Sequence, residues 1–146
     1  MVMNTDKREI ITSSEEETEN IGKELAQSLC RGDSVLLRGN LGAGKTVFSR
    51  GFARGLGITE PVSSPTYTIV QEYELPSGGR LYHLDLYRIS GVNAALAFGV
   101  DEFLDDPQGI SLIEWPDRID GILPDNAISV EIEHLSDTER RLTICR

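Results

Sequence analysis

The sequence has few cysteines and no long hydrophobic run. Its two cysteines, Cys30 and Cys145, lie far apart and form no CxxC motif. We interpret them as reduced thiols of a cytoplasmic protein, and a pairing between them stays open. No run of about 20 apolar residues is present, so we expect no membrane span. Residues 1–9 are too polar for a signal peptide, which also favours a cytoplasmic location.

Positive charge is also scarce. The 146 residues contain 14 Lys and Arg against 24 Asp and Glu, a net charge of −10. This balance argues against a broad nucleic-acid-binding surface, because affinity for phosphate backbones comes largely from Lys and Arg. Acidic runs such as 15–17 are more typical of a solvated face than of a docking patch. Between residues 26 and 59, however, one acid, Asp33, accompanies five cations, which predicts a locally basic region. The five are Arg31, Arg38, Lys45, Arg50 and Arg54.

One stretch organises the rest of the chain. Residues 39–46 read GNLGAGKT and match the phosphate-loop pattern G-x-x-x-x-G-K-[ST] at every fixed position. The pattern requires a strand before the loop, and the apolar segment 34–38 is suited to one. It also requires a helix after the loop, and apolar residues recur at helical spacing from Phe48 to Leu56, before Gly57. The motif and its context therefore agree.

The chemistry of a phosphate loop follows from its geometry. Glycines let successive N–H groups point at phosphate oxygens, and the helix N-terminus adds about half a positive charge. Lys45 is expected to reach the β- and γ-phosphates of ATP, and the Thr46 hydroxyl to ligate Mg²⁺. The motif thus predicts ATP and Mg²⁺ as cofactors. The predicted nucleotide-binding residues here are Leu41, Gly42, Ala43, Gly44, Lys45, Thr46 and Val47.

The N-terminal part of the chain predicts a strand that begins at 10–11 and then a helix. Ser14 and Glu17 have the spacing of a capping box, and the helix is expected to run to about Cys30, before Gly32. The helix is interpreted either as scaffold or as a shelf for the adenine base, and the pattern does not decide between them.

Two segments beyond the phosphate loop carry polar residues. Residues 63–68, SSPTYT, form either a loop fixed by proline or a switch segment near the γ-phosphate, and we favour the switch. After a turn at 76–79, a strand is predicted over 80–88, with His83, Asp85 and Tyr87 on one face. This strand is interpreted as a site wall or as an amphipathic edge strand. We favour the wall, because an aspartate within a strand needs a partner.

The C-terminal half completes an α/β pattern. Residues 91–104 read as helical with a break at Gly99, and 127–133 and 141–145 alternate like an antiparallel pair. The apolar run 110–115 contains Glu114 at its end, where ligands bind in open α/β sheets. Pro116 is expected to start a short helix through Ile119. We therefore predict an α/β fold, a P-loop NTPase-like mixed β-sheet flanked by helices, as a single domain over 1–146.

Four blocks together resemble one family. They are GNLGAGKT at 39–46, SSPTYT at 63–68, HLDLYR at 83–88 and IEWPDR at 113–118. In order and spacing they are similar to the bacterial tRNA threonylcarbamoyladenosine biosynthesis ATPases, the TsaE family. The resemblance extends from about Thr12 to the last predicted strand.

The resemblance implies a role for each matching residue. Lys45 would bind phosphates and act in catalysis, and Glu114 would serve the metal together with Thr46. Asp85 would act in hydrolysis, by orienting water or supporting the metal, and Glu15 would belong to the nucleotide site. Trp115, next to Glu114, is interpreted either as core packing or as a cover for the ligand.

The resemblance also implies partners. The ATPase would act with a threonylcarbamoyl-transfer complex of TsaD- and TsaB-type proteins, which modifies adenosine 37 of tRNAs reading ANN codons. The tRNA would be held mainly by those partners. Two alternatives from other classes remain: a small-molecule P-loop kinase, and a nucleotide-gated binding module without useful turnover.

Overall fold

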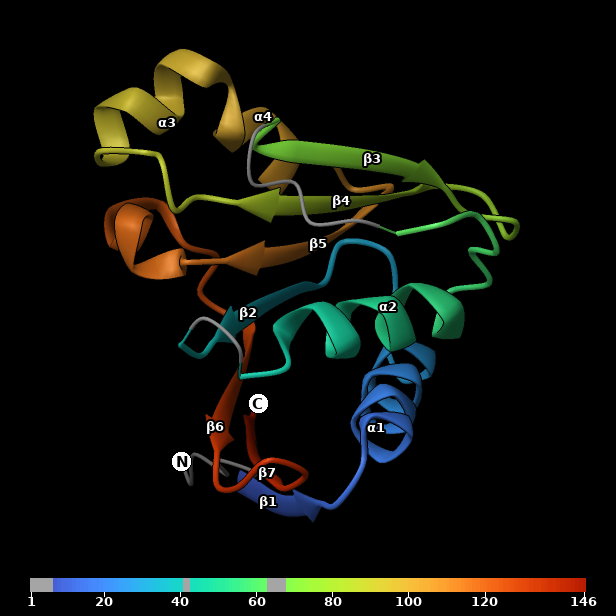
Figure 1. Cartoon of the computed structure of the whole chain (residues 1–146). Helices are drawn as coiled ribbons and strands as arrows, with labels where there is room; N and C mark the ends of the chain where they lie inside the picture. Colours follow the sequence, from blue (N-terminus) through green and yellow to red (C-terminus); the bar gives the residue numbers. More distant parts are fainter. Residues whose placement is uncertain (1–6, 41–42, 63–67) are drawn as a thin grey trace, which may run out of the picture.

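The computed structural model describes residues 7–40, 43–62 and 68–146 and forms three layers (Figure 1). A sheet of seven strands separates α1 and α2 on one face from α3, α4 and the short helix η1 on the other. In chain order the elements are β1 (Lys7–Thr12), α1 (Glu15–Gln27), β2 (Ser34–Arg38), α2 (Lys45–Gly55), β3 (Val70–Glu74), β4 (Arg80–Asp85), α3 (Val92–Phe98), α4 (Val100–Leu104), β5 (Gly109–Glu114), η1 (Pro116–Ile122), β6 (Ile128–His134) and β7 (Arg140–Cys145).

The sheet is mixed, as predicted. The strand order is β1-β7-β6-β2-β5-β4-β3, and the four central strands β6, β2, β5 and β4 are parallel to their neighbours in that group. Antiparallel strands complete both edges: the β3–β4 hairpin on one side, and β7 and β1 on the other. The antiparallel pair predicted over 127–133 and 141–145 is therefore confirmed as β6 and β7. Strand β2, which precedes the phosphate loop, lies at the centre.

Side chains of β2 show how the two layers of core are formed. Val35 and Leu37 belong to the cluster beneath α1 and α2, whereas Leu36 belongs to the cluster beneath α3, α4 and η1. Successive side chains of a strand point to opposite faces, and strands covered on both faces are continuously apolar. The uninterrupted apolar run of this strand is the result.

Helix α1 begins at the predicted cap. The Ser14 hydroxyl accepts a hydrogen bond from the Glu17 N–H at 3.1 Å. The Glu17 carboxylate reaches one residue further back than a capping box requires, and accepts from the Ser13 hydroxyl at 2.9 Å. The helix ends at Gln27, before the predicted Cys30, and Ser28 closes it with a hydrogen bond from its hydroxyl to the Leu25 carbonyl at 2.7 Å.

Strand β4 corrects one sequence interpretation. It ends at Asp85 instead of continuing to Arg88, and it lies between β3 and β5. The interpretation of this segment as an amphipathic edge strand is therefore wrong. Both faces of β4 are covered, so that His83 and Asp85 are buried along with the apolar Leu84. The alternation of side chains between the two faces was predicted correctly, but it could not reveal that β3 and β5 pair with β4 along its two edges.

Other predicted elements differ from the structure only in where they begin or end. The break between α3 and α4 lies at Gly99, with φ of +95°, and η1 begins at Pro116 but runs past a kink at Ile119. Strand β1 begins at Lys7, earlier than predicted. Both cysteines are free thiols. Within the part of the chain that is described, no helix has the length and apolar character needed to cross a membrane.

Glycines allow α1 and α2 to pack closely. A Cβ on Gly51 of α2 would collide with the Glu19 carbonyl of α1, and one on Gly22 of α1 would collide with the Phe48 carbonyl of α2. A Cβ on Gly55 would lie 2.5 Å from the Lys23 carbonyl. Each contact is with backbone, which cannot move aside as a flexible side chain can. The two helices are thus held at backbone contact.

Gly51→Ala should therefore destabilise the fold, although alanine favours a helix by about 1 kcal/mol. Overpacking of this kind costs about 1–3 kcal/mol. Urea unfolding of the variant and the wild type measures the difference. The control is Gly121→Ala in η1, whose Cβ would meet Val92 at an ordinary 3.6 Å and should change stability by less than about 0.5 kcal/mol. Equal stabilities for all three proteins would contradict the close helix contact.

Candidate functional site

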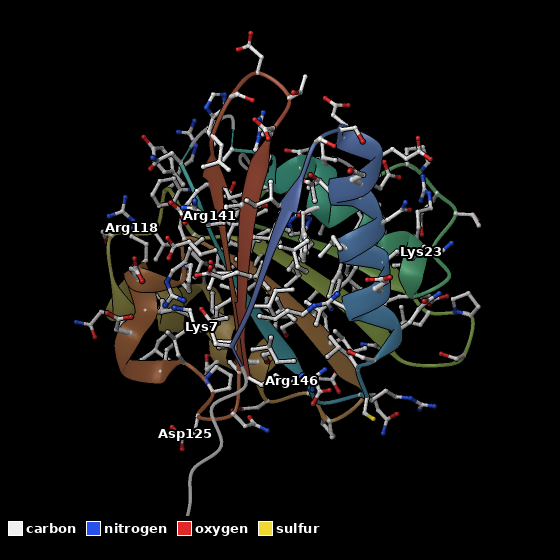
Figure 2. All side chains as sticks on the ribbon, turned by 90° about the horizontal axis from the view of Figure 1, so that it is seen from below. Lys7, Lys23, Arg118, Asp125, Arg141 and Arg146 are labelled. Atoms are coloured by element: carbon white, nitrogen blue, oxygen red, sulfur yellow. The ribbon has the colours of Figure 1, made fainter. Side chains whose placement is uncertain are left out.

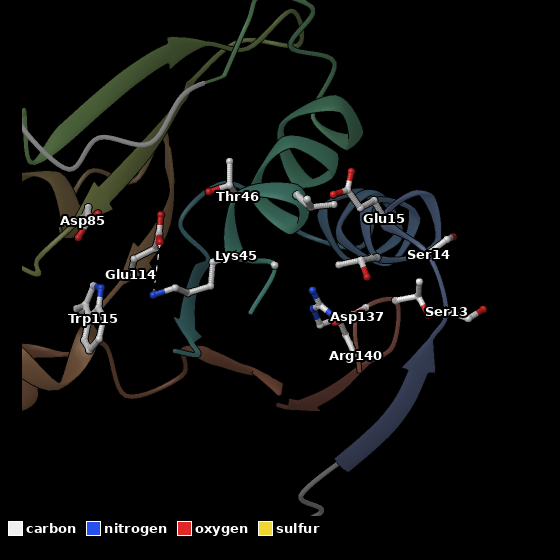
Figure 3. A pocket seen from close by; sticks show the side chains of 14 residues that line it. Ser13, Ser14, Glu15, Lys45, Thr46, Asp85, Glu114, Trp115, Asp137 and Arg140 are labelled. Atoms are coloured by element: carbon white, nitrogen blue, oxygen red, sulfur yellow. Dashed lines mark ion pairs between the residues drawn. The ribbon is translucent and has the colours of Figure 1, made fainter. Parts of the chain in front are cut away.

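A pocket of about 620 Å³ opens where α2 begins (Figure 3). Its described walls come from the start of α1, the start of α2, the ends of β4 and β5, and the β6–β7 connection. In Figure 3, Asp85, Glu114 and Trp115 lie at one end, Ser13, Asp137 and Arg140 at the other, and Lys45 and Thr46 between them. The lining residues are Ser13, Ser14, Glu15, Thr18, Gly44, Lys45, Thr46, Val47, Asp85, Glu114, Trp115, Asp137, Thr138 and Arg140.

Most of the predicted site residues meet in this pocket. Glu15, Gly44, Lys45, Thr46, Val47, Asp85 and Glu114 all line it. Ala43 is buried and lines a neighbouring cavity instead. Leu41 and Gly42, and residues 63–67 of the predicted switch, lie outside the described residues.

Sheet register brings the two acids together. Leu37 of β2 pairs with Glu114 of β5, which in turn pairs with Asp85 of β4. All three strands are parallel, so their carboxyl ends open at one edge, where ligands bind in open α/β sheets. Residues 29 positions apart in the sequence thereby become neighbours at the pocket floor.

The start of α2 presents backbone donors to the pocket. Gly44 has φ of +107°, and the helix begins directly after it with no side chain capping its first turn. The first N–H bonded within the helix is that of Phe48, which donates to the Gly44 carbonyl at 3.0 Å. The N–H groups of Lys45, Thr46 and Val47 precede that bond and have no intrahelical acceptor. Such uncapped donors, with the helix dipole, suit an anion.

Lys45 is held by an acid and an aromatic ring. Its Nζ lies 3.9 Å from Oε1 of Glu114 and 4.4 Å from the centroid of the Trp115 ring. The side chains of Lys45 and Glu114 are each 7% exposed, so their charges are little screened by water. The ion pair and the cation–π contact satisfy a lysine whose ammonium group faces the pocket.

His83 lay on the strand face predicted as a site wall, but no individual role was predicted for it. Its Nε2 lies 2.7 Å from Oε2 of Glu114, and the ring is 1% exposed. The period of two placed His83 on the same face as Asp85, which was the available signal. The sequence did not show that Glu114, on the next strand, would lie within hydrogen-bond distance.

The predicted basic region does not surround the pocket. Of its five cations only Lys45 lines the pocket. Arg31 donates to Gln108, Arg38 and Arg50 pair with Asp117 and Glu19, and Arg54 donates to the carbonyls of Ile58 and Glu60. Figure 2 shows other cations dispersed as well, with Lys23 and Arg118 on opposite sides of the molecule. Proximity in sequence was a poor guide, because helix faces and strand ends point these arginines outward.

The second cation of the pocket comes from the end of the chain. Arg140 donates from Nη1 to the carbonyls of Ser136 at 2.7 Å and Glu139 at 2.9 Å. Its Nε would lie 3.7 Å from a Cβ on Gly44. The β6–β7 connection thus holds a guanidinium against the phosphate loop, opposite Glu15 at the start of α1. Nothing in the sequence near residue 140 signalled this position.

Two residues beside the acids have unusual backbones. Among the described residues other than glycine, only Ile69 and Trp115 have positive φ, at 69° and 57°. The Ile69 carbonyl accepts from the Asp85 N–H at 2.8 Å, and Trp115 directly follows Glu114. Left-handed conformations are costly for such side chains and concentrate at functional sites. Trp115 is half-buried against the core and also lines the pocket, so both of its predicted roles fit.

The mixed sheet, with a phosphate-loop motif between its central strand and α2, defines the class of P-loop NTPase-like folds. The family model for "Threonylcarbamoyl adenosine biosynthesis protein TsaE" matches residues 12–142, and the chain belongs to this family. The resemblance of the four sequence blocks is thereby confirmed.

Individual relatives support the same family assignment. The chain is 44% identical to the tRNA threonylcarbamoyladenosine biosynthesis protein TsaE of Bacillus subtilis over 135 residues, which cover 90% of this chain and 81% of the relative. It is 40% identical to the TsaE protein of Aquifex aeolicus, over 95% and 96% of the two chains. The crystal structure of B. subtilis YdiB superposes with a TM-score of 0.81 at 37% identity, over 99% of this chain and 88% of that one.

The buried ion pair should be energetically coupled. Lys45→Met or Glu114→Gln alone leaves one buried charge without its partner, which is more costly than removing both. Unfolding free energies of the wild type, the single variants and the double variant, without nucleotide or metal, should give a coupling of about 1 kcal/mol. The control pair, Arg141 and Glu133, lies 3.6 Å apart but is 39% and 44% exposed, and should couple by less than about 0.5 kcal/mol. Additive effects at the buried pair would show that the contact is not made.

Proposed function

We propose that this chain is the Mg²⁺-dependent ATPase subunit required for threonylcarbamoyladenosine formation at adenosine 37 of tRNAs reading ANN codons. It acts with a threonylcarbamoyl-transfer complex of TsaD- and TsaB-type proteins. The observation that carries the ATPase is the meeting of Lys45 and the uncapped start of α2 with Asp85 and Glu114 in one pocket. The tRNA pathway is supported by the names of the relatives.

The residues present fit a nucleoside triphosphate with its metal. The pocket combines the uncapped start of α2, a buried lysine and a carboxylate within reach of that lysine, and its volume of about 620 Å³ suits a ligand of this size. Lys45 and the N–H groups of 45–47 would hold the phosphates, and Thr46 and Glu114 the metal. A bound Mg²⁺ supplies charge neutralisation to the phosphate oxygens.

Lys45 changes its partner in this proposal. Its contact with Oε1 of Glu114, at 3.9 Å, is longer than a charge-assisted hydrogen bond of about 2.8 Å. Phosphate oxygens therefore offer Lys45 a better acceptor than Glu114 does. Once Lys45 turns to the phosphates, Oε1 of Glu114 is available to the metal.

Asp85 is the residue proposed to orient the attacking water. It is 4% exposed and lies beside Glu114 at the carboxyl edge of the sheet. The Tyr87 N–H donates to its Oδ1 at 3.0 Å, which fixes the carboxylate relative to the chain. The backbone of Asp85 is tied to Ile69, two residues after the segment 63–67.

Charge supports the division of labour with partners. At a net charge of −10, with the arginines of α2 and its surroundings engaged in internal contacts, few cations can neutralise tRNA phosphates. The tRNA would therefore be held by the partner proteins. The kinase alternative gains no support. The cations among the described pocket residues are Lys45 and Arg140, and the Arg140 guanidinium already donates a hydrogen bond to the Ser136 carbonyl in the β6–β7 connection.

ATP with Mg²⁺ should stabilise the fold. At a ligand concentration 100 times Kd the gain is about 2.7 kcal/mol. Lys45→Ala should remove most of it, because the lysine is the principal cation for the phosphates. Thermal unfolding with and without MgATP measures the gain, and Lys23→Ala, on the exposed face of α1, is the matched control. The same stabilisation of Lys45→Ala and wild type would refute the phosphate site.

Reconstitution tests the partner-dependent ATPase. The chain alone should hydrolyse ATP slowly and bind tRNA weakly, and hydrolysis should rise when the TsaD- and TsaB-type pair is added. Asp85→Ala should bind MgATP but fail to support repeated rounds of tRNA modification, while Asp125→Ala, an exposed acid away from the pocket, should behave as wild type. Full activity without partners, or repeated modification by Asp85→Ala, would contradict the proposal.

A further inference from the structure

His83 is a buried residue that contacts the carboxylate of Glu114. It lies on β4 with 1% of its surface exposed, and its Nε2 is 2.7 Å from Oε2 of Glu114. Its other ring nitrogen, Nδ1, is a buried side-chain atom for which the described residues supply no hydrogen-bond partner. An unsatisfied buried polar atom is unfavourable. A purely structural position would be filled better by an apolar residue, as at its register partner Leu112.

The direction of the hydrogen bond is fixed by chemistry. A carboxylate has no proton to donate, so Nε2 carries the hydrogen and donates to Glu114. The register supports a stable geometry: His83 pairs with Leu112, and Glu114 follows two residues later on the same face of β5. Both side chains rise from central strands of the sheet, which are the least mobile supports that the fold offers.

The two carboxylate oxygens of Glu114 have different partners. Oε2 is held by His83, and Oε1 faces Lys45 in the pocket. Lys45 contacts Oε1, so a move of Lys45 to another anion would leave the hydrogen bond between His83 and Oε2 in place. A carboxylate held by one oxygen keeps the other aimed at the same point in the pocket.

We propose that His83 is a positioning residue that holds Glu114 for Mg²⁺ while Lys45 is engaged with the nucleotide phosphates. The inference rests on the proposed function, because it assigns the metal to Glu114. It predicts that His83 contributes to metal-dependent nucleotide binding and much less to metal-free binding. A residue important only for packing would affect both alike.

The experiment uses variants that separate the donor from the ring. In His83→Gln, the side-chain amide can place a donor near the position of Nε2. In His83→Asn, the shorter amide ends near the position of Nδ1, away from Glu114. His83→Phe keeps a ring of similar size without any donor. His134→Gln, at the exposed end of β6, is the control at the other histidine of the chain.

The readout is the dissociation constant of ATP, measured by calorimetry with Mg²⁺ and again with a chelator. The ratio of the two constants is the Mg²⁺ enhancement. Removing a group that supports a metal ligand typically weakens metal affinity by about 10- to 100-fold. His83→Asn and His83→Phe should lose the enhancement by about that factor with little change in the chelator. His83→Gln should restore most of it, and His134→Gln should match the wild type.

The outcomes distinguish the two proposals. A wild type whose ATP binding is independent of Mg²⁺ would overturn the proposed function and this inference with it. A wild-type enhancement that His83→Asn retains would overturn the inference alone. So would equal losses in both conditions, or a failure of His83→Gln to differ from His83→Asn. If His83→Phe does not fold, the comparison of the two amide variants decides.

Discussion

The parallel register of β2, β5 and β4 is the constraint on which the site depends. It aligns Leu37, Glu114 and Asp85 across three strands, so that the phosphate loop leaves the sheet beside the two acids. No loop has to adopt a special path to bring the acids together. The same register places His83 diagonally from Glu114, which is why a buried histidine can support that carboxylate. The pocket floor is therefore as rigid as the centre of the sheet.

The wall of the pocket depends on a second constraint, the backbone contact between α1 and α2. The start of α1 contributes Ser14 and Glu15 to the pocket, and the start of α2 contributes the phosphate loop residues. Because Gly22 and Gly51 let the helices touch, the distance between these two starts is set by backbone atoms rather than by adaptable side chains. The glycines thus matter for the site although they do not line it.

The sequence predicted the elements, and the candidate residues that line one pocket, better than the surroundings of those residues. Phosphate loop, capping serine and hairpin are local patterns, in which neighbouring residues specify the geometry. The contact between His83 and Glu114, and the place of Arg140, depend on which strands become neighbours. The same is true of the arginines near the loop: their number between residues 26 and 59 predicted a locally basic region, but the helix face and the strand end that carry them determine their partners. The spacing of residues in the sequence shows which side chains share a face of a helix or strand. Which side chains contact each other across strands depends on the order of strands in the folded sheet.

Trp115 gives the protein a built-in optical reporter. It is the single tryptophan of the chain, and its ring lies 4.4 Å from the Lys45 ammonium and 5.1 Å from the Tyr87 ring. Indole emission responds to nearby charge and to water, and a cation over the ring interacts with its π-electrons. We therefore expect any event that draws Lys45 away to change the emission of this single tryptophan. A ligand that displaces Lys45 should then be detectable in real time without an attached dye.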